Sequence, residues 1–208
     1  MLPLVLTVTG ALASLAACTM PERGPRSAVL GFWFEPVSYA SPVLAGSVTP
    51  HDLAIVEAVA RAEIVAAFQD MNITVSDHRD ARYRVQVVQE LLDQRMRTRK
   101  VSVAGQSHVA KGLGGRGAVN FNYMASAAIV YAPESAGRHE IVEAIGRGIG
   151  RAAVHEFTHQ LLPTAEIDGT HDRLSYEYGA ASRIEQYFGT LHWDFAGPLL
   201  AARFKASP

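Results

Sequence analysis

Two histidines and one glutamate between residues 155 and 159 have the spacing of a metal site. The segment reads His155-Glu156-Phe-Thr-His159. Residues four apart on an α-helix project from the same face, so the two imidazoles can bind one metal ion. Glu156 is then free to take the proton of a water molecule held by that metal. The pattern predicts a zinc site that hydrolyses its substrate with an activated water.

The residues before this motif have the pattern of a long helix. Apolar and small residues recur at three- and four-residue spacing from His139 onward, and Pro163 marks the end of the segment. Gly146, Gly148 and Gly150 each weaken a helix interior by about 1 kcal/mol relative to alanine. Their presence predicts that a sheet or another backbone packs very close to this helix.

The amino-terminal segment predicts the cellular location of the protein. Residues 2–17 form a mostly apolar run that ends in Leu15-Ala-Ala-Cys18, which resembles the lipobox of bacterial lipoproteins. About 16 residues suit a signal peptide better than a membrane span. The resemblance implies a signal peptide over 1–17, a lipid on Cys18 and a tether over 18–27. The mature protein is therefore expected in the bacterial cell envelope, anchored to the membrane, and in the outer membrane or periplasm of a Gram-negative cell.

Cysteine content and charge exclude several classes of site. Cys18 is the one cysteine of the chain, which excludes an internal disulfide and a multi-thiolate zinc site. A net charge of −1 and a sequence pI near 6.7 leave no basic footprint for nucleic acid. The one basic cluster, Arg95 to Lys100, is expected in a solvated loop, or against anionic head groups if the protein is lipid-anchored.

Two other patterns do not support a function. Gly112, Gly114 and Gly117 satisfy G-x-G-x-x-G, but the strand before them and the helix after them that a nucleotide site needs are missing, so no nucleotide is expected. No nucleophile-elbow pattern surrounds the serines in the central part of the chain, which excludes a serine hydrolase. These serines are Ser102, Ser107 and Ser126.

The order of the remaining elements predicts a single α/β (α+β) domain over residues 28–208. Thr49, Pro50 and Asp52 have the types expected at the start of a helix. We expect a small twisted mixed sheet packed on the helix that carries the two histidines. The expected elements are strands at 27–34, 73–76, 83–89 and 127–132, a helix at 50–68, and a glycine-rich stretch at 105–117.

This order resembles the upper subdomain of the zincin metallopeptidases, and residues 53–162 look broadly like a metzincin. Metzincins continue their motif as HExxHxxGxxH, whereas Leu162 and Ala165 stand here at the glycine and third-histidine positions. Downstream, Gly169-Thr-His-Asp172 and the later Tyr178-Gly pair look like the aspzincin pattern G-T-x-D-x-x-Y-G. Five residues rather than two separate Asp172 from Tyr178. The resemblance implies that Asp172 is the third zinc ligand.

Other residues compete for that third position. Imidazole has the better intrinsic affinity for zinc, which favours His171, and Glu177 would complete a His₂Glu site. His192 and Glu185 are further candidates. Whichever of His171 and Asp172 does not bind the metal is expected to hydrogen-bond a histidine that does.

A hydrolytic mechanism follows from these residues. Zinc lowers the pKa of bound water toward 7, and Glu156 takes the proton and later returns it to the leaving amine. Tyr176 or Tyr178 could donate to the oxyanion, although core packing with a satisfied hydroxyl is favoured over this role for each of them. Residues 119–123 could pair with an extended peptide as an edge strand. The aromatic tail 186–194 could line a specificity pocket or belong to the core.

The sequence therefore predicts a zinc-dependent metallopeptidase that acts on a peptide or protein substrate. One alternative is a catalytically retired zincin fold that serves as an envelope binding or assembly factor. Another keeps zinc hydrolysis but directs it to a non-protein amide, such as one in cell-wall peptide. The presence of Glu156 argues against a retired site.

Overall fold

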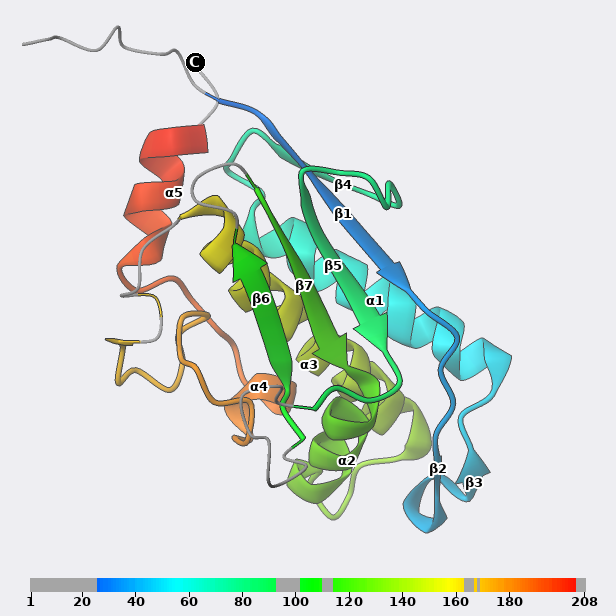
Figure 1. Cartoon of the computed structure of the whole chain (residues 1–208). Helices are drawn as coiled ribbons and strands as arrows, with labels where there is room; N and C mark the ends of the chain where they lie inside the picture. Colours follow the sequence, from blue (N-terminus) through cyan, green and yellow to red (C-terminus); the bar gives the residue numbers. More distant parts are fainter. Residues whose placement is uncertain (1–25, 93–101, 110–113, 163–166, 168, 205–208) are drawn as a thin grey trace, which may run out of the picture.

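The computed structural model describes residues 26–92, 102–109, 114–162, 167 and 169–204 as a mixed α/β structure (Figure 1). A five-stranded sheet has the order β4-β1-β5-β7-β6, in which β6 alone runs antiparallel to its neighbour. The strands are β1 Ala28–Phe34, β4 Ile73–Ser76, β5 Tyr83–Val88, β6 Gly105–Val109 and β7 Gly115–Asn120. The helices are α1 Pro50–Ala67, α2 Phe121–Tyr131, α3 Arg138–Leu161, α4 Glu185–Phe188 and α5 Ala196–Phe204. A small hairpin of β2 Ala40–Ser41 and β3 Gly46–Ser47 encloses a short 3₁₀ helix, Pro42–Leu44.

The core lies between the sheet and helices α1 and α3. Alternate residues of β1 and β5 point to opposite faces, as the pleat of a strand requires. Leu30 and Phe32 of β1, with Val85 and Val87 of β5, are fully buried on the helical side. The structure confirms the coarse prediction, a mixed α/β fold whose sheet packs on the helix that carries the two histidines.

Helix α1 begins where the sequence predicts. The Thr49 hydroxyl accepts a hydrogen bond from the Asp52 backbone N–H, and the Asp52 carboxylate accepts one from the Thr49 N–H at 2.7 Å. This reciprocal cap satisfies two backbone donors that the first turn leaves open. Arg138, the first residue of α3, also donates to Asp52 at 2.7 Å. The guanidinium holds the pKa of the Asp52 carboxyl well below its usual range and joins the starts of the two helices.

Helices α1 and α3 pack backbone to backbone, which explains two of the three glycines in α3. A Cβ atom on Gly146 would lie 2.8 Å from the Val56 carbonyl oxygen, and one on Gly150 would lie 2.5 Å from the Ala60 carbonyl oxygen. Gly148 faces the ring of Tyr187 instead. The close approach predicted from these glycines is confirmed, with α1 as the neighbouring backbone.

A Gly150→Ala variant is therefore expected to be less stable than the wild type by about 1–3 kcal/mol, because the added methyl group would push α1 away. In an ordinary helix interior the same change stabilises by about 1 kcal/mol. Urea unfolding monitored by circular dichroism measures the difference. Gly169→Ala is the matched control, because nothing lies within 4 Å of a Cβ atom at that position. Equal stability of the two variants would contradict the close packing.

The strand predicted at 127–132 is wrong, because these residues belong to the second half of α2 and its C-cap. Asn120 caps this helix: its side-chain oxygen accepts a hydrogen bond from the Tyr123 backbone N–H at 3.1 Å. Its amide nitrogen also donates to the Leu91 and Val103 carbonyls and to the Ser102 hydroxyl. The helix buries Phe121 and three other residues, so the apolar run that suggested a strand is the inner face of a helix.

The predicted edge strand at 119–123 also differs from the structure. Residues 119 and 120 end β7, which lies between β5 and β6, and residue 121 already begins α2. The expectation that 119–123 form an edge strand is therefore wrong. On this side of the sheet the edge strand is β6, and β4 forms the opposite edge. The glycine-rich stretch contributes to both β6 and β7. No helix within the described ranges is long and apolar enough to cross a membrane.

Candidate metal-binding site

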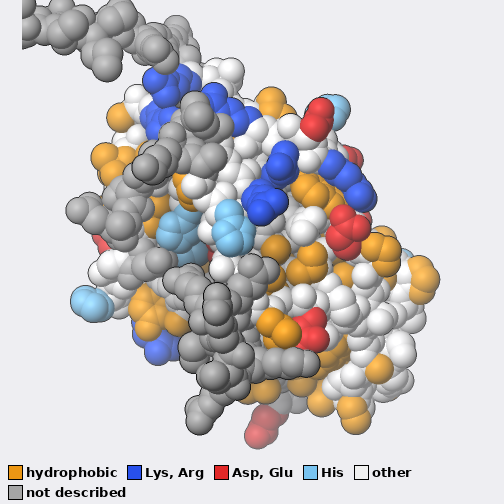
Figure 2. All heavy atoms as spheres, in the orientation of Figure 1, with side chains coloured by type: hydrophobic (Ala, Val, Ile, Leu, Met, Phe, Trp, Pro, Cys, Tyr) orange, Lys and Arg blue, Asp and Glu red, His pale blue; other side chains and the backbone are white. Residues whose placement is uncertain are grey.

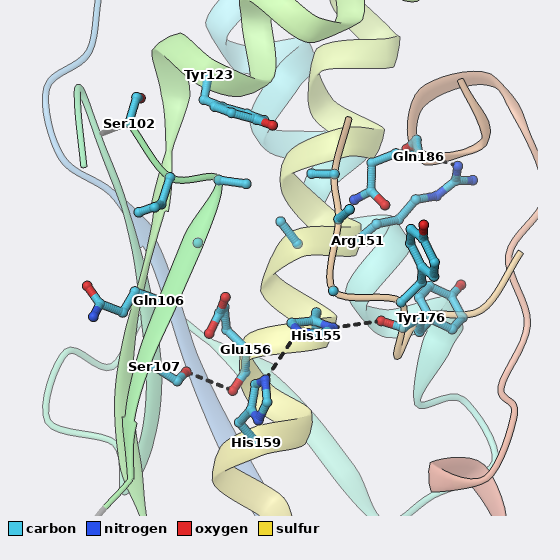
Figure 3. A pocket seen from close by; sticks show the side chains of 18 of the residues that line it. Ser102, Gln106, Ser107, Tyr123, Arg151, His155, Glu156, His159, Tyr176 and Gln186 are labelled. Atoms are coloured by element: carbon cyan, nitrogen blue, oxygen red, sulfur yellow. Dashed lines mark hydrogen bonds between the residues drawn. The ribbon is translucent and has the colours of Figure 1, made fainter. Parts of the chain in front are cut away.

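A cavity of about 610 Å³ lies between β6, the carboxyl-terminal half of α3 and the chain from Tyr176 to Gln186 (Figure 3). His155, Glu156 and His159 all line it. Tyr176 and Tyr178 belong to the same wall. The structure therefore brings together five of the residues that the sequence singled out for chemistry.

The two histidines converge on one point. Their Nε2 atoms are 3.1 Å apart, and their ring planes meet at 81° with centroids 4.8 Å apart. Two imidazole nitrogens bound at 2.0–2.1 Å to a tetrahedral zinc ion are separated by about 3.3 Å. The observed separation is close to that value. The two Nε2 atoms are within hydrogen-bond distance of each other, and this separation is also close to that of two imidazole nitrogens on one zinc ion.

His155 is also oriented by a second contact. Its Nδ1 lies 2.9 Å from the Tyr176 backbone carbonyl oxygen, which can only accept a hydrogen bond. The Nδ1–H group therefore donates, and the Nε2 lone pair is left to face the cavity. Histidines that bind metals usually have their other ring N–H held in this way, by a carbonyl or a carboxylate.

Glu156 is packed against the edge strand. It is 6% exposed, and a Cβ atom at Gly105 of β6 would collide with its carboxylate. The Ser107 hydroxyl, two residues along β6, donates to the Glu156 backbone carbonyl at 3.0 Å. Strand β6 thus fixes the position of the predicted general base. The sequence predicts that the glycine-rich segment lies beside the cleft, but it does not indicate the contact of Ser107, which was considered only as a nucleophile.

Gln160, next to the second histidine, ties the helix to the interior of the sheet. Its side-chain oxygen accepts from the Arg84 backbone N–H at 2.9 Å, and its amide nitrogen donates to the Arg84 carbonyl at 3.1 Å. Gly115 and Gly117 of β7 leave the space that this side chain occupies. The glycines of the G-x-G-x-x-G pattern that the structure describes therefore serve close packing and, at Gly114, a turn with a φ of 117°.

The two tyrosines differ in their surroundings. The ring of Tyr176 packs on Trp193 with centroids 4.9 Å apart, and burial raises the pKa of its phenol. The hydroxyl is therefore protonated at neutral pH, as an ordinary tyrosine is, and can donate a hydrogen bond. The ring of Tyr178 lies over the guanidinium of Arg183, with the central carbon 4.8 Å from the ring centroid.

Two buried arginines hold the cavity wall, and the sequence did not single them out. Arg151, one turn before His155, donates to Glu63 at 3.0 Å and to the Glu185 carbonyl at 2.9 Å. Arg183 is 1% exposed and donates to the Ser175 carbonyl and to the Gln186 side chain. Both act on the backbone downstream of the histidines, so they define where Tyr176 lies.

Most of the aromatic tail belongs to the core. Tyr187 is fully buried against Gly148, and Trp193 packs on Phe68 with centroids 5.6 Å apart. Gln186 is the tail residue that lines the cavity. Of the two uses considered for this tail, packing accounts for its aromatic side chains.

The structure does not bring the candidates for a third ligand to the cavity. Asp172 forms an ion pair with His192 at 2.8 Å and accepts from the Leu174 N–H, a bond that lowers the pKa of its carboxyl. Glu177 is fully buried and accepts from the Asp194 and Ala196 backbone N–H groups and from the Ser175 hydroxyl. Glu185 pairs with Arg173 at 3.2 Å, and His171 is exposed.

Within the described residues, no group of three histidine, cysteine or acidic side chains is placed to hold a metal ion. The identity of the third ligand therefore stays a prediction. Cys18, the basic run 95–100 and Gly112 lie outside the residues that the structure describes.

No protein-family model, no curated protein and no solved structure matches this chain.

Proposed function

We propose that this protein is a zinc-dependent metallopeptidase with a zincin-like site, lipid-anchored through Cys18 in the bacterial cell envelope. The observation that carries the proposal is the convergence of two Nε2 atoms, 3.1 Å apart, beside the buried carboxylate of Glu156. The hydrogen bond from His155 to the Tyr176 carbonyl supports the proposal. A smaller polar residue could make the same bond if its role were packing alone.

Each residue of the cavity has a role in peptide hydrolysis. His155 and His159 would hold the zinc ion, which when bound supplies a Lewis acid and a more acidic water. Glu156 lines the same cavity and would accept the proton of the attacking water and return it to the leaving amine. The protonated phenol of Tyr176, or that of Tyr178, would donate to the oxygen that gains charge.

The edge strand supports a peptide as the substrate. β6 pairs with β7 on one side only and lines the cavity through Gly105, Gln106 and Ser107. An extended peptide can add to such an edge by backbone hydrogen bonds. A peptide bound there would pass the carboxylate of Glu156, which packs against Gly105.

For the third ligand, Asp172 stays the first candidate and His171 the second. This order follows the aspzincin-like pattern, and binding through Asp172 would require its carboxylate to exchange the ion pair with His192 for the metal. Glu177 is the weakest of the three candidates, because it already accepts hydrogen bonds from two backbone N–H groups and a hydroxyl.

Two other functions remain as alternatives. A retired zincin fold could act as a binding or assembly factor, but a retired site has no need to retain a buried carboxylate beside two converging imidazoles. Hydrolysis of an amide in cell-wall peptide would use the same residues, and only the substrate would differ.

A broad peptide library tests the proposal. The zinc-loaded full chain is expected to produce defined cleavage products by mass spectrometry, and a chelator is expected to abolish them. Cleavage of isolated cell-wall peptide alone would favour the third function. If no substrate is cleaved and a Glu156→Gln protein still restores the phenotype of a deletion strain, the peptidase proposal fails and the retired fold replaces it.

A further inference from the structure

The face of the sheet opposite α1 and α3 carries a second hollow. In Figure 1 the sheet lies in front of these two helices, so its other face is turned toward the viewer. Side chains on that face line a hollow of about 690 Å³, which is within the size range of small-molecule sites. Sheets with parallel strands usually have both faces covered, so polar residues on a face that no described helix covers need an explanation.

The strand register arranges this hollow in two rows. Arg84 of β5 pairs with Arg116 of β7, and Arg116 pairs with His108 of β6. One step along the strands, two glutamines flank a small residue: Gln86 pairs with Ala118, and Ala118 pairs with Gln106. Adjacent strands are about 4.8 Å apart, so each row presents three neighbouring positions. The small side chain of Ala118 leaves space between the two glutamines of the second row.

The row of Arg84 and Arg116 is positively charged without internal compensation. Like charges directly opposite each other destabilise a sheet. Neither guanidinium forms an ion pair with any residue that the structure describes, whereas Arg79, at the rim, pairs with Glu35. Asp80 is the one carboxylate that lines the hollow, and it is exposed. Figure 2 shows Lys and Arg side chains gathered over this part of the sheet.

Two arginines at paired strand positions in one hollow best match a doubly charged oxyanion. A phosphate monoester carries about −1.5 to −2 charges at pH 7 and three acceptor oxygens, so it can engage both side chains at once. A single carboxylate would leave one of the two positive charges without a partner. Gln86 and Gln106 add donors and acceptors in the next row, which suit hydroxyl groups. The indole of Trp33, which pairs with Gln86 in the register, gives the hollow one apolar wall.

We propose that this hollow binds a small hydroxylated phosphate monoester, such as a sugar phosphate, with its phosphate between Arg84 and Arg116 and its hydroxyl groups toward Gln86 and Gln106. Strand β6 separates the hollow from the cavity of the histidines, and the proposal does not depend on peptide hydrolysis. Arg84 is half-buried and Arg116 is exposed, and both line a hollow rather than a flat face, which favours a small ligand over the surface of an anionic membrane.

Titration calorimetry of the full chain tests this site, with glucose 6-phosphate as the probe and glucose and inorganic phosphate as comparisons. Saturable 1:1 binding of glucose 6-phosphate is expected, with weaker binding of phosphate and none of glucose. Arg116→Gln is expected to weaken binding about tenfold or more, because it removes one charge-assisted contact. Arg84→Gln should act similarly and should fold, since the backbone of Arg84, not its side chain, bonds Gln160.

Arg26→Gln is the matched control, because it makes the same charge change outside the hollow, and it should bind as the wild type does. Three outcomes would overturn the proposal. The first is that no heat of binding is detected up to about 10 mM glucose 6-phosphate, which would mean that the affinity is negligible. Another is equal weakening by Arg26→Gln, which would show a general charge effect. The third is binding of phosphatidylglycerol vesicles that depends on Arg84 and Arg116 while glucose 6-phosphate does not bind.

Discussion

Replacing Glu156 with glutamine is expected to lower the rate of peptide hydrolysis by about 10²–10⁴-fold while the protein keeps its fold and its zinc. Glutamine has the size of glutamate, so it fits the same space against Gly105. It cannot take a proton from water at neutral pH. Initial rates on a peptide from the library screen, measured beside zinc content and a circular dichroism spectrum, give the result.

A matched control for this variant is Glu143→Gln. Glu143 lies in the same helix, pairs with His139 and Arg147 on its exposed side and does not line the cavity. Its variant should hydrolyse the peptide at the wild-type rate. A Glu156→Gln protein that is folded, holds zinc and remains fully active would mean that another group activates the water.

The second large effect is expected for zinc content. The purified full chain should hold close to one zinc ion, and a His155→Ala, His159→Ala double variant should hold nearly none, because the two converging Nε2 atoms supply the preorganised ligands. Inductively coupled plasma mass spectrometry after dialysis measures the ratio. His139→Ala, in the same helix but with a side chain that is 72% exposed, should keep the wild-type content.

The same assay separates the third-ligand candidates. Of Asp172→Ala and His171→Ala, the variant that lowers zinc affinity more identifies the ligand. Loss of a residue that only orients a ligand should weaken binding by about 10–100-fold. Unchanged zinc content in the double histidine variant would show that the metal, if present, binds elsewhere.

Long elements with strong local signals could be predicted from the sequence. Helix α1 has a capping box, a proline at its first position and an apolar stripe, and α3 has a regular apolar period interrupted by glycines that pack on α1. Such local signals act within one or two turns, so a single sequence contains them. The pair His155 and His159 could be placed on one face for the same reason.

The wrong predictions concern segments whose structure depends on tertiary contacts that the sequence does not show. Strand β6 reads Gly-Gln-Ser-His-Val, which has no apolar alternation because one side faces a cavity and the other an open hollow. The apolar run after β7 was assigned to a strand, although Asn120 caps a helix there. Arg183 belongs to a residue type that is almost never fully buried, so its position under Tyr178 could not be expected.

The hydrogen bond from His155 to the Tyr176 carbonyl joins a helix to a segment 21 residues downstream. If His155 binds zinc as proposed, metal binding and ordering of that segment would be thermodynamically linked, and each would favour the other by the same free energy. When metal is scarce, this segment would open more often than the helices behind it. Proteolysis acts on open segments, so the cellular lifetime of the protein would follow the supply of zinc.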